Sequence, residues 1–144
     1  MRWFSIAGLA LVAAAGVSTS LYAQSAPKFT VWTGVYTAAQ ADRGKAVYAE
    51  HCARCHNEGL EGKDEIPPLK GSHFLSNWDA QQVSDLTQRI RGTMPLDNPG
   101  SLSAASTTDL VAYLLQQNDV PAGAAELSSD PFTQAGIQIA AQKP

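Results

Sequence analysis

The sequence of 144 residues has few cysteines and no excess of positive charge. Cys52 and Cys55 are its only cysteines, which excludes a framework of several disulfides. Ten Lys and Arg residues against 13 Asp and Glu residues give a formal net charge of -3, so no broad basic surface is available for nucleic acid. Methionine is scarce as well, because Met94 is the only one besides the initiator. The length and the 44% hydrophobic composition predict one modest globular domain.

The N-terminal segment predicts export. Arg2 is followed by an uncharged, mostly apolar run over residues 3–17 and then by small and polar residues. This order is typical of a secretory signal peptide, and we place the cleavage after Ala23. The alternative is a retained anchor, since the run extended to Tyr22 approaches the roughly 20 residues that span a bilayer. We therefore predict a periplasmic protein with signal peptide 1–23, which contacts the membrane only if this segment is retained.

Beyond this segment no strand pattern or internal repeat is visible, and the apolar residues follow a helical period. We expect three main helices and two long loops between them. The helices run from Ala38 into the cysteine pair, from the N-cap Asp79 to near Gly92, and from the N-cap Ser103 to Asn118. The loops are residues 57–71, rich in Gly, Pro and charge, and residues 94–100.

Two flanking segments show no sustained period. Residues 24–37 are predicted to be a linker or a surface-bound arm, and residues 121–144 a poorly ordered or surface-bound extension. The folded domain is therefore expected over residues 38–120. Three helices with so much loop bury little apolar surface by themselves. A hydrophobic group at the centre of the domain would supply the missing core.

The motif Cys-Ala-Arg-Cys-His over residues 52–56 is the most specific feature of the sequence. Two thiols at this spacing meet the two vinyl groups of a haem, and the His that follows is placed beneath the iron. We predict one haem c, attached covalently through Cys52 and Cys55, with His56 as an iron ligand. This assignment would also explain the two thiols of an exported chain.

Two other uses of Cys-x-x-Cys compete with haem. A thioredoxin-like dithiol would need strands around the cysteines, and none is predicted. A structural zinc site would need four ligands, so that His51 or His73 would have to join Cys52, Cys55 and His56. Adjacent Cys and His ligands crowd a tetrahedral site, and no second cysteine pair exists.

The second axial position of the iron requires a further ligand. Met94 lies between the predicted end of a helix and Pro95, and a Met thioether raises the reduction potential and suits electron transfer. The alternatives are that Met94 only fills a gap in the core, or that His73 provides bis-His ligation. We predict His56 and Met94 as the metal ligands and His73 as a surface side chain.

These residues resemble the class I c-type cytochromes, which are monohaem proteins with an all-helical fold. The resemblance runs over about residues 38–118 and is carried by the cysteine motif and the Met94-Pro95 pair. It implies an all-α class I cytochrome c fold, with three main helices and long loops around one haem. The stretch 74–102 is also similar to cytochromes found beside exported quinoprotein dehydrogenases.

The resemblance assigns further roles to particular residues. It implies that Gly44 and Tyr48 of the first helix pack against Leu110 and Tyr113 of the last one. It also implies that the carbonyl of Pro67 accepts a hydrogen bond from His56, which would fix the imidazole tautomer. Trp78 and Arg91 are candidates for contacts with the haem propionates, although Trp78 fits a plain core position equally well.

We expect an electron carrier without catalytic residues, which exchanges electrons with partners such as a dehydrogenase or a terminal oxidase. The alternative is the haem subunit of a larger exported dehydrogenase or oxidase complex, with the arm or the C-terminal extension as the docking element. An enzyme or gas sensor, in which Met94 dissociates from the iron, is the third hypothesis.

Overall fold

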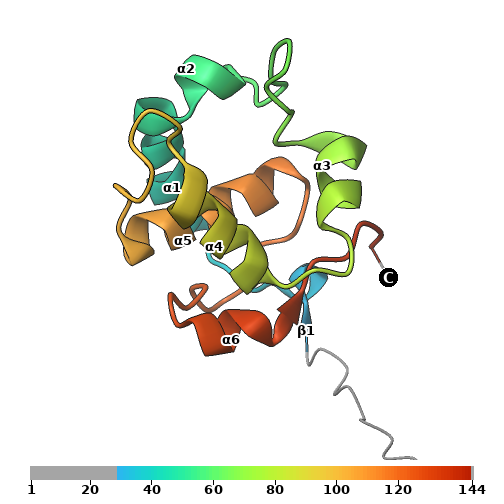
Figure 1. The fold of residues 1–144 in the computed structure, drawn as a ribbon. Coiled ribbons are helices and arrows are strands. Elements are labelled where there is room, and N and C mark those ends of the chain that lie inside the picture. The colour runs from blue at the N-terminus through green and yellow to red at the C-terminus, as the bar shows by residue number, and fades with distance from the viewer. Residues whose placement is uncertain (1–28, 144) are drawn as a thin grey trace, which may run out of the picture.

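The computed structural model describes residues 29–143, and the predicted signal peptide lies outside them. The described chain is mostly helical, as predicted (Figure 1). The helices are α1 (Ala38–His51), α2 (Ala53–His56), α3 (Gly71–Trp78), α4 (Val83–Thr93), α5 (Ala104–Gln117) and α6 (Pro131–Ala135), with a 3-10 turn η1 (Val31–Thr33) and two short strands, β1 (Phe29–Thr30) and β2 (Ile137–Gln138). Within residues 29–143, no helix has both the length and the apolar character needed to cross a membrane.

The crossing of α1 over α5 is the most extensive helix contact within the described residues. Gly44 lies at the crossing, where an added Cβ would stand 1.9 Å from the carbonyl oxygen of Asp109 and 2.9 Å from Cβ of Tyr113. One turn later, the rings of Tyr48 and Tyr113 meet with their centroids 5.5 Å apart. The packing that the family resemblance implied for Gly44 and Tyr48 is therefore confirmed.

The region between the cysteine motif and α4 contains a helix that the sequence analysis did not predict. The two turns of α3 bury Phe74, whose ring lies 6.5 Å from that of Trp78. The prediction of Asp79 as the N-cap of the next helix is wrong. Helix α4 begins after Gln82, which is its N-cap and forms a capping box with Asp85. Asp79 instead accepts a hydrogen bond from the backbone of Ala141, 2.8 Å away.

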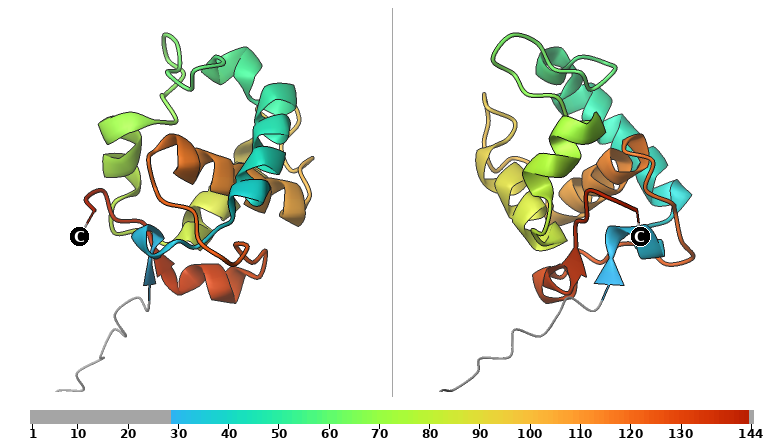
Figure 2. Two further views of the ribbon diagram at one scale, coloured as in Figure 1. Left: turned by 180° about the vertical axis from the view of Figure 1, so that it is seen from behind. Right: turned by 90° about the vertical axis from the view of Figure 1, so that its right-hand side faces the viewer.

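The arm and the C-terminal segment lie against each other and against the helices. Strand β1 pairs in parallel with β2, so the prediction of no strand is wrong for these four residues. Trp32 donates through its indole Nε1 to the carbonyl of Ala140 at 2.9 Å. Ile139 exchanges backbone hydrogen bonds with the α3–α4 turn, from its N to Gln81 O and from Ala80 N to its O. Figure 2 shows both segments on one side of the helices.

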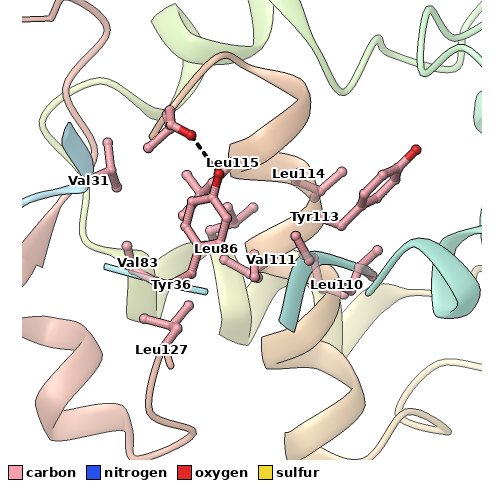
Figure 3. Close-up of a cluster of buried hydrophobic side chains, with 14 of the residues drawn as sticks. Val31, Tyr36, Val83, Leu86, Leu110, Val111, Tyr113, Leu114, Leu115 and Leu127 are labelled. Atoms are coloured by element: carbon pink, nitrogen blue, oxygen red, sulfur yellow. Dashed lines mark hydrogen bonds between the residues drawn. The ribbon is translucent and has the colours of Figure 1, made fainter. Parts of the chain in front are cut away.

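The buried core is centred on α5 and includes side chains from both flanking segments. Figure 3 shows Val31 and Tyr36 of the arm and Leu127 of the C-terminal segment beside α4 and α5. The hydroxyl of Tyr36 donates to the carbonyl of Val120 at 2.5 Å. Gln40 is also buried and pairs with the backbone of Leu127 in both directions, at 3.0 and 2.7 Å. The limits proposed for the domain, 38–120, stay a prediction.

Candidate functional site

The cysteine motif forms a single helical turn at the end of α1. The amide of Cys52 donates to Tyr48 O, and the amides of Cys55 and His56 both donate to Cys52 O, which closes the turn of α2. Residues three apart on a helix lie on one face, so both thiols belong to the same surface. Cys55 is exposed, whereas Cys52 is partly buried. Burial, together with the nearby Cys55, raises the pKa of the Cys52 thiol to about 11, so the free side chain is uncharged at neutral pH.

His56 is buried, and its ring is held by Pro67 of the loop 57–71, called the proline loop below. Its Nδ1 lies 3.0 Å from the carbonyl oxygen of Pro67 and must be the donor, since a carbonyl only accepts. In this tautomer Nε2 carries the lone pair, and no described residue forms a hydrogen bond with it. The imidazole is therefore fixed in orientation and has one nitrogen free to ligate a metal.

The loop after His56 is tied back to the motif at several points. The hydroxyl of Tyr48 donates to Asn57 O at 2.5 Å, and the amide of Gly62 donates to His56 O at 3.1 Å. Gly62 has a φ of +70°, and a Cβ added there would lie 2.2 Å from Ile66 O. Only a glycine fits this turn, which brings Pro67 back toward the imidazole.

Asn118 supports the proline loop from α5, a role that sequence analysis missed. Its Nδ2 donates to Leu69 O at 3.1 Å and to Leu114 O at 2.8 Å, and its Oδ1 accepts from Gly71 N at 2.9 Å. In the sequence, Asn118 indicates only the end of a helix. No local pattern distinguishes a capping Asn from one that bonds a loop 47 residues away. Its burial, with 4% exposed, is visible only in the folded chain.

Met94 ends α4, where its amide donates to Ile90 O at 2.9 Å. Its side chain is partly buried against the hydrophobic core. His73, the competing axial ligand, is exposed on α3, and its Nδ1 lies 3.3 Å from Nδ2 of Asn77. His51 is exposed too and lies 3.7 Å from Glu50. These positions agree with Met94 as the second ligand, which stays a prediction.

The other expected contacts of the haem are less well supported. Trp78 is partly buried against the core beside Phe74. Arg91 lines a pocket between α4 and the C-terminal segment, together with Ser129 and Gln134. The position of Trp78 agrees with the core interpretation, and Arg91 faces the C-terminal segment. Both propionate contacts stay predictions.

The donor set fits a haem. Two thiols on one turn, an imidazole fixed through Nδ1 and a thioether on another segment are the groups that a c-type haem requires. Within residues 29–143, no three His, Cys, Asp or Glu side chains are grouped to hold a metal ion, so the zinc alternative has no ligand set there.

Comparison with known proteins decides the family. Residues 39–114 match the family "Cytochrome C oxidase, cbb3-type, subunit III". The chain belongs to this cytochrome c family. Cytochrome c6 of Synechocystis is 31% identical over 81 residues, which are 56% of this chain and 68% of that protein. A haem c attached through Cys52 and Cys55, with His56 after them, is therefore confirmed. The matched region is a cytochrome c domain.

Longer proteins also match part of the chain. Thiosulfate dehydrogenase of Stutzerimonas stutzeri is 35% identical over 79 residues, 50% of this chain and 25% of that protein. The cbb3-type oxidase subunit CcoP of Azospirillum brasilense is 38% identical over 65 residues, 40% of this chain and 22% of the subunit. The structure of the sulfane dehydrogenase SoxCD from Paracoccus pantotrophus aligns with a TM-score of 0.51 and 26% identity, over 65% of this chain and 51% of that one. The cytochrome thus spans about half or less of these three proteins.

Proposed function

We propose that the cytochrome shuttles electrons between exported redox partners, with its haem iron ligated by His56 and Met94. The observation that carries this proposal is the 3.0 Å contact from His56 Nδ1 to Pro67 O, because it leaves Nε2 to the iron. Met94 is the only methionine of the described residues and is partly buried at the end of α4. A haem held by His56 and Met94 would supply one-electron redox chemistry and would leave no iron position open to a substrate.

Optical spectra of the holoprotein test the axial ligands. We expect a weak long-wavelength iron-to-sulfur band in the oxidised wild type, its loss in Met94→Ala, and a lower reduction potential in Met94→His. Leu96→Ala is the matched control, since this side chain follows in the same loop and is 78% exposed. A wild type without the band, or a Met94→Ala protein that keeps it, would contradict the assignment of Met94.

The proposal includes a periplasmic location after removal of residues 1–23. The basic residue, apolar run and small-residue end of this segment support it. N-terminal sequencing of the protein recovered from the periplasm should begin at Gln24. An intact N-terminus recovered in the membrane fraction would instead indicate that the segment is retained as an anchor.

A second candidate function is the haem subunit of a larger exported dehydrogenase or oxidase. It is favoured because three of the matched proteins are named as a dehydrogenase or as a subunit of an oxidase. Each of them is also much longer than the part that this chain matches. Phe29 and Phe132 in the flanking segments are 51% and 88% exposed and offer apolar contacts to a partner. Co-purification with a catalytic subunit from the native host, weakened by Phe132→Ser, would support this function. A monomer that exchanges electrons freely would count against it.

A further inference from the structure

The loop after Met94, residues 95–102, has a single polar side-chain contact with the rest of the described chain. Residues 96–101 are exposed, and the backbone hydrogen bonds that residues 95–102 donate or accept stay within the loop. Asp97 forms an ion pair with Arg54. For the part of the chain that the structure describes, this is the only side-chain hydrogen bond or ion pair that joins residues 95–102 to another segment.

The ion pair bridges two segments that are otherwise separated by a pocket. The pocket has a volume of about 490 Å³ and is lined by Arg54 on one side and by Pro95, Asp97 and Leu102 on the other. Leu102 is buried and fixes the far end of the loop. The contact of Asp97 with Arg54 therefore connects the middle of the loop to the other side of the pocket.

Each end of the ion pair belongs to a segment that carries an axial ligand. Arg54 stands between the two cysteines and two residues before His56, so the thioether bonds would fix its backbone next to this ligand. Asp97 follows Met94 by three residues. The attraction between the two side chains therefore opposes movement of the Met94 segment away from the cysteine motif. The Arg54 guanidinium also holds the pKa of the Asp97 carboxyl below its usual value, which agrees with a close contact.

We propose that Arg54 and Asp97 are positioning residues. Their ion pair holds the loop 95–102 against the cysteine motif and slows the departure of Met94 from the iron. This inference rests on the proposed His56 and Met94 ligation. The pair is exposed, with 74% and 57% of its side-chain surfaces accessible, so its effect is modest and is screened by salt. We expect each single substitution to speed the replacement of Met94 by an external ligand roughly two- to fivefold.

The experiment measures cyanide binding to the oxidised holoprotein at cyanide concentrations where departure of Met94 limits the rate. Arg54→Gln and Asp97→Asn should raise this limiting rate to the same extent, and the double variant should add little further. The reversed pair, Arg54→Asp with Asp97→Arg, should restore much of the wild-type rate. The differences should shrink in 1 M salt. Arg89→Gln, which removes an exposed charge of α4 that forms no ion pair with another described residue, is the control and should match the wild type.

The outcomes separate the two proposals. Variants that keep the iron-to-sulfur band and bind cyanide at the wild-type rate would overturn the role of Arg54 and Asp97 and leave Met94 ligation standing. A wild type without the band would overturn both, and the failure would lie with the ligand. Equal denaturation midpoints in Asp97→Asn and Arg89→Gln, together with different cyanide rates, would show that the effect is on the loop rather than on global stability.

Discussion

The hydroxyl of Tyr48 connects helix α1 to the loop that supports His56. It donates to Asn57 O, and the phenol ring packs against Tyr113. Burial is the main cause that raises the pKa of this phenol, and the pKa of Tyr113 is raised by burial as well. The two tyrosines are alike in burial and differ in their hydroxyls, because no described residue forms a hydrogen bond with that of Tyr113. The pair therefore separates the value of one hydrogen bond from that of ring packing.

We predict that Tyr48→Phe lowers the free energy of unfolding by about 1–3 kcal/mol, since the substitution removes the donor and leaves the carbonyl of Asn57 without its partner. Denaturant unfolding of the oxidised holoprotein measures this change. Tyr113→Phe is the matched control, for which we expect a change within about 0.5 kcal/mol. Equal losses in the two variants would mean that the hydroxyl contact with Asn57 contributes nothing.

At the scale of elements, the motif and the helices around it could be predicted, whereas the supports of the site could not. Haem attachment needs residues that are adjacent in sequence, so the turn over residues 52–56 was recognisable. Helix α3 has only eight residues, and its buried Phe74 gives too short a pattern for a helical period. Asn118 looks like any helix-capping Asn. Strands of two residues leave no alternation to detect, so the pairing of Phe29 with Ile137 was missed.

Gly44 sets the distance between α1 and α5. In most helices a glycine costs stability relative to alanine, by roughly 0.5–1 kcal/mol. At this position, an added Cβ would lie 1.9 Å from the Asp109 carbonyl oxygen, far inside van der Waals contact, and this backbone atom cannot rotate away. The steric cost of alanine therefore exceeds its gain in helix propensity.

We expect Gly44→Ala to destabilise the holoprotein by about 3 kcal/mol or more, the upper range for overpacking. The control is Gly92→Ala in α4, where an added Cβ meets nothing within 4 Å. That substitution should be neutral or stabilise by up to about 1 kcal/mol. Thermal unfolding followed by circular dichroism compares the two variants. A Gly44→Ala protein as stable as Gly92→Ala would refute the close crossing.

At the scale of the whole molecule, the arm and the C-terminal segment form a cover over one side of the helices. Arg43 of α1 contacts both Asp109 of α5 and Glu126 of the C-terminal segment at 2.9 Å. Val31 of the arm and Ile139 of the C-terminal segment are fully buried. Apolar burial of this extent contributes more to stability than exposed ion pairs do. The haem-binding helices and the cover should therefore unfold together.

Substitution of Ile139 tests whether the cover and the haem-binding helices form one cooperative unit. We predict that Ile139→Ala costs about 2–4 kcal/mol, because it leaves a cavity beside the α3–α4 turn. The loss should appear equally in far-ultraviolet circular dichroism and in the haem absorption, with coincident midpoints. Phe132→Ala, in the same segment but 88% exposed, should change neither. If Ile139→Ala left the haem transition unchanged while an earlier transition appeared in circular dichroism, the cover would be a separate unit, and the domain would be limited to the region 38–120 expected from the sequence.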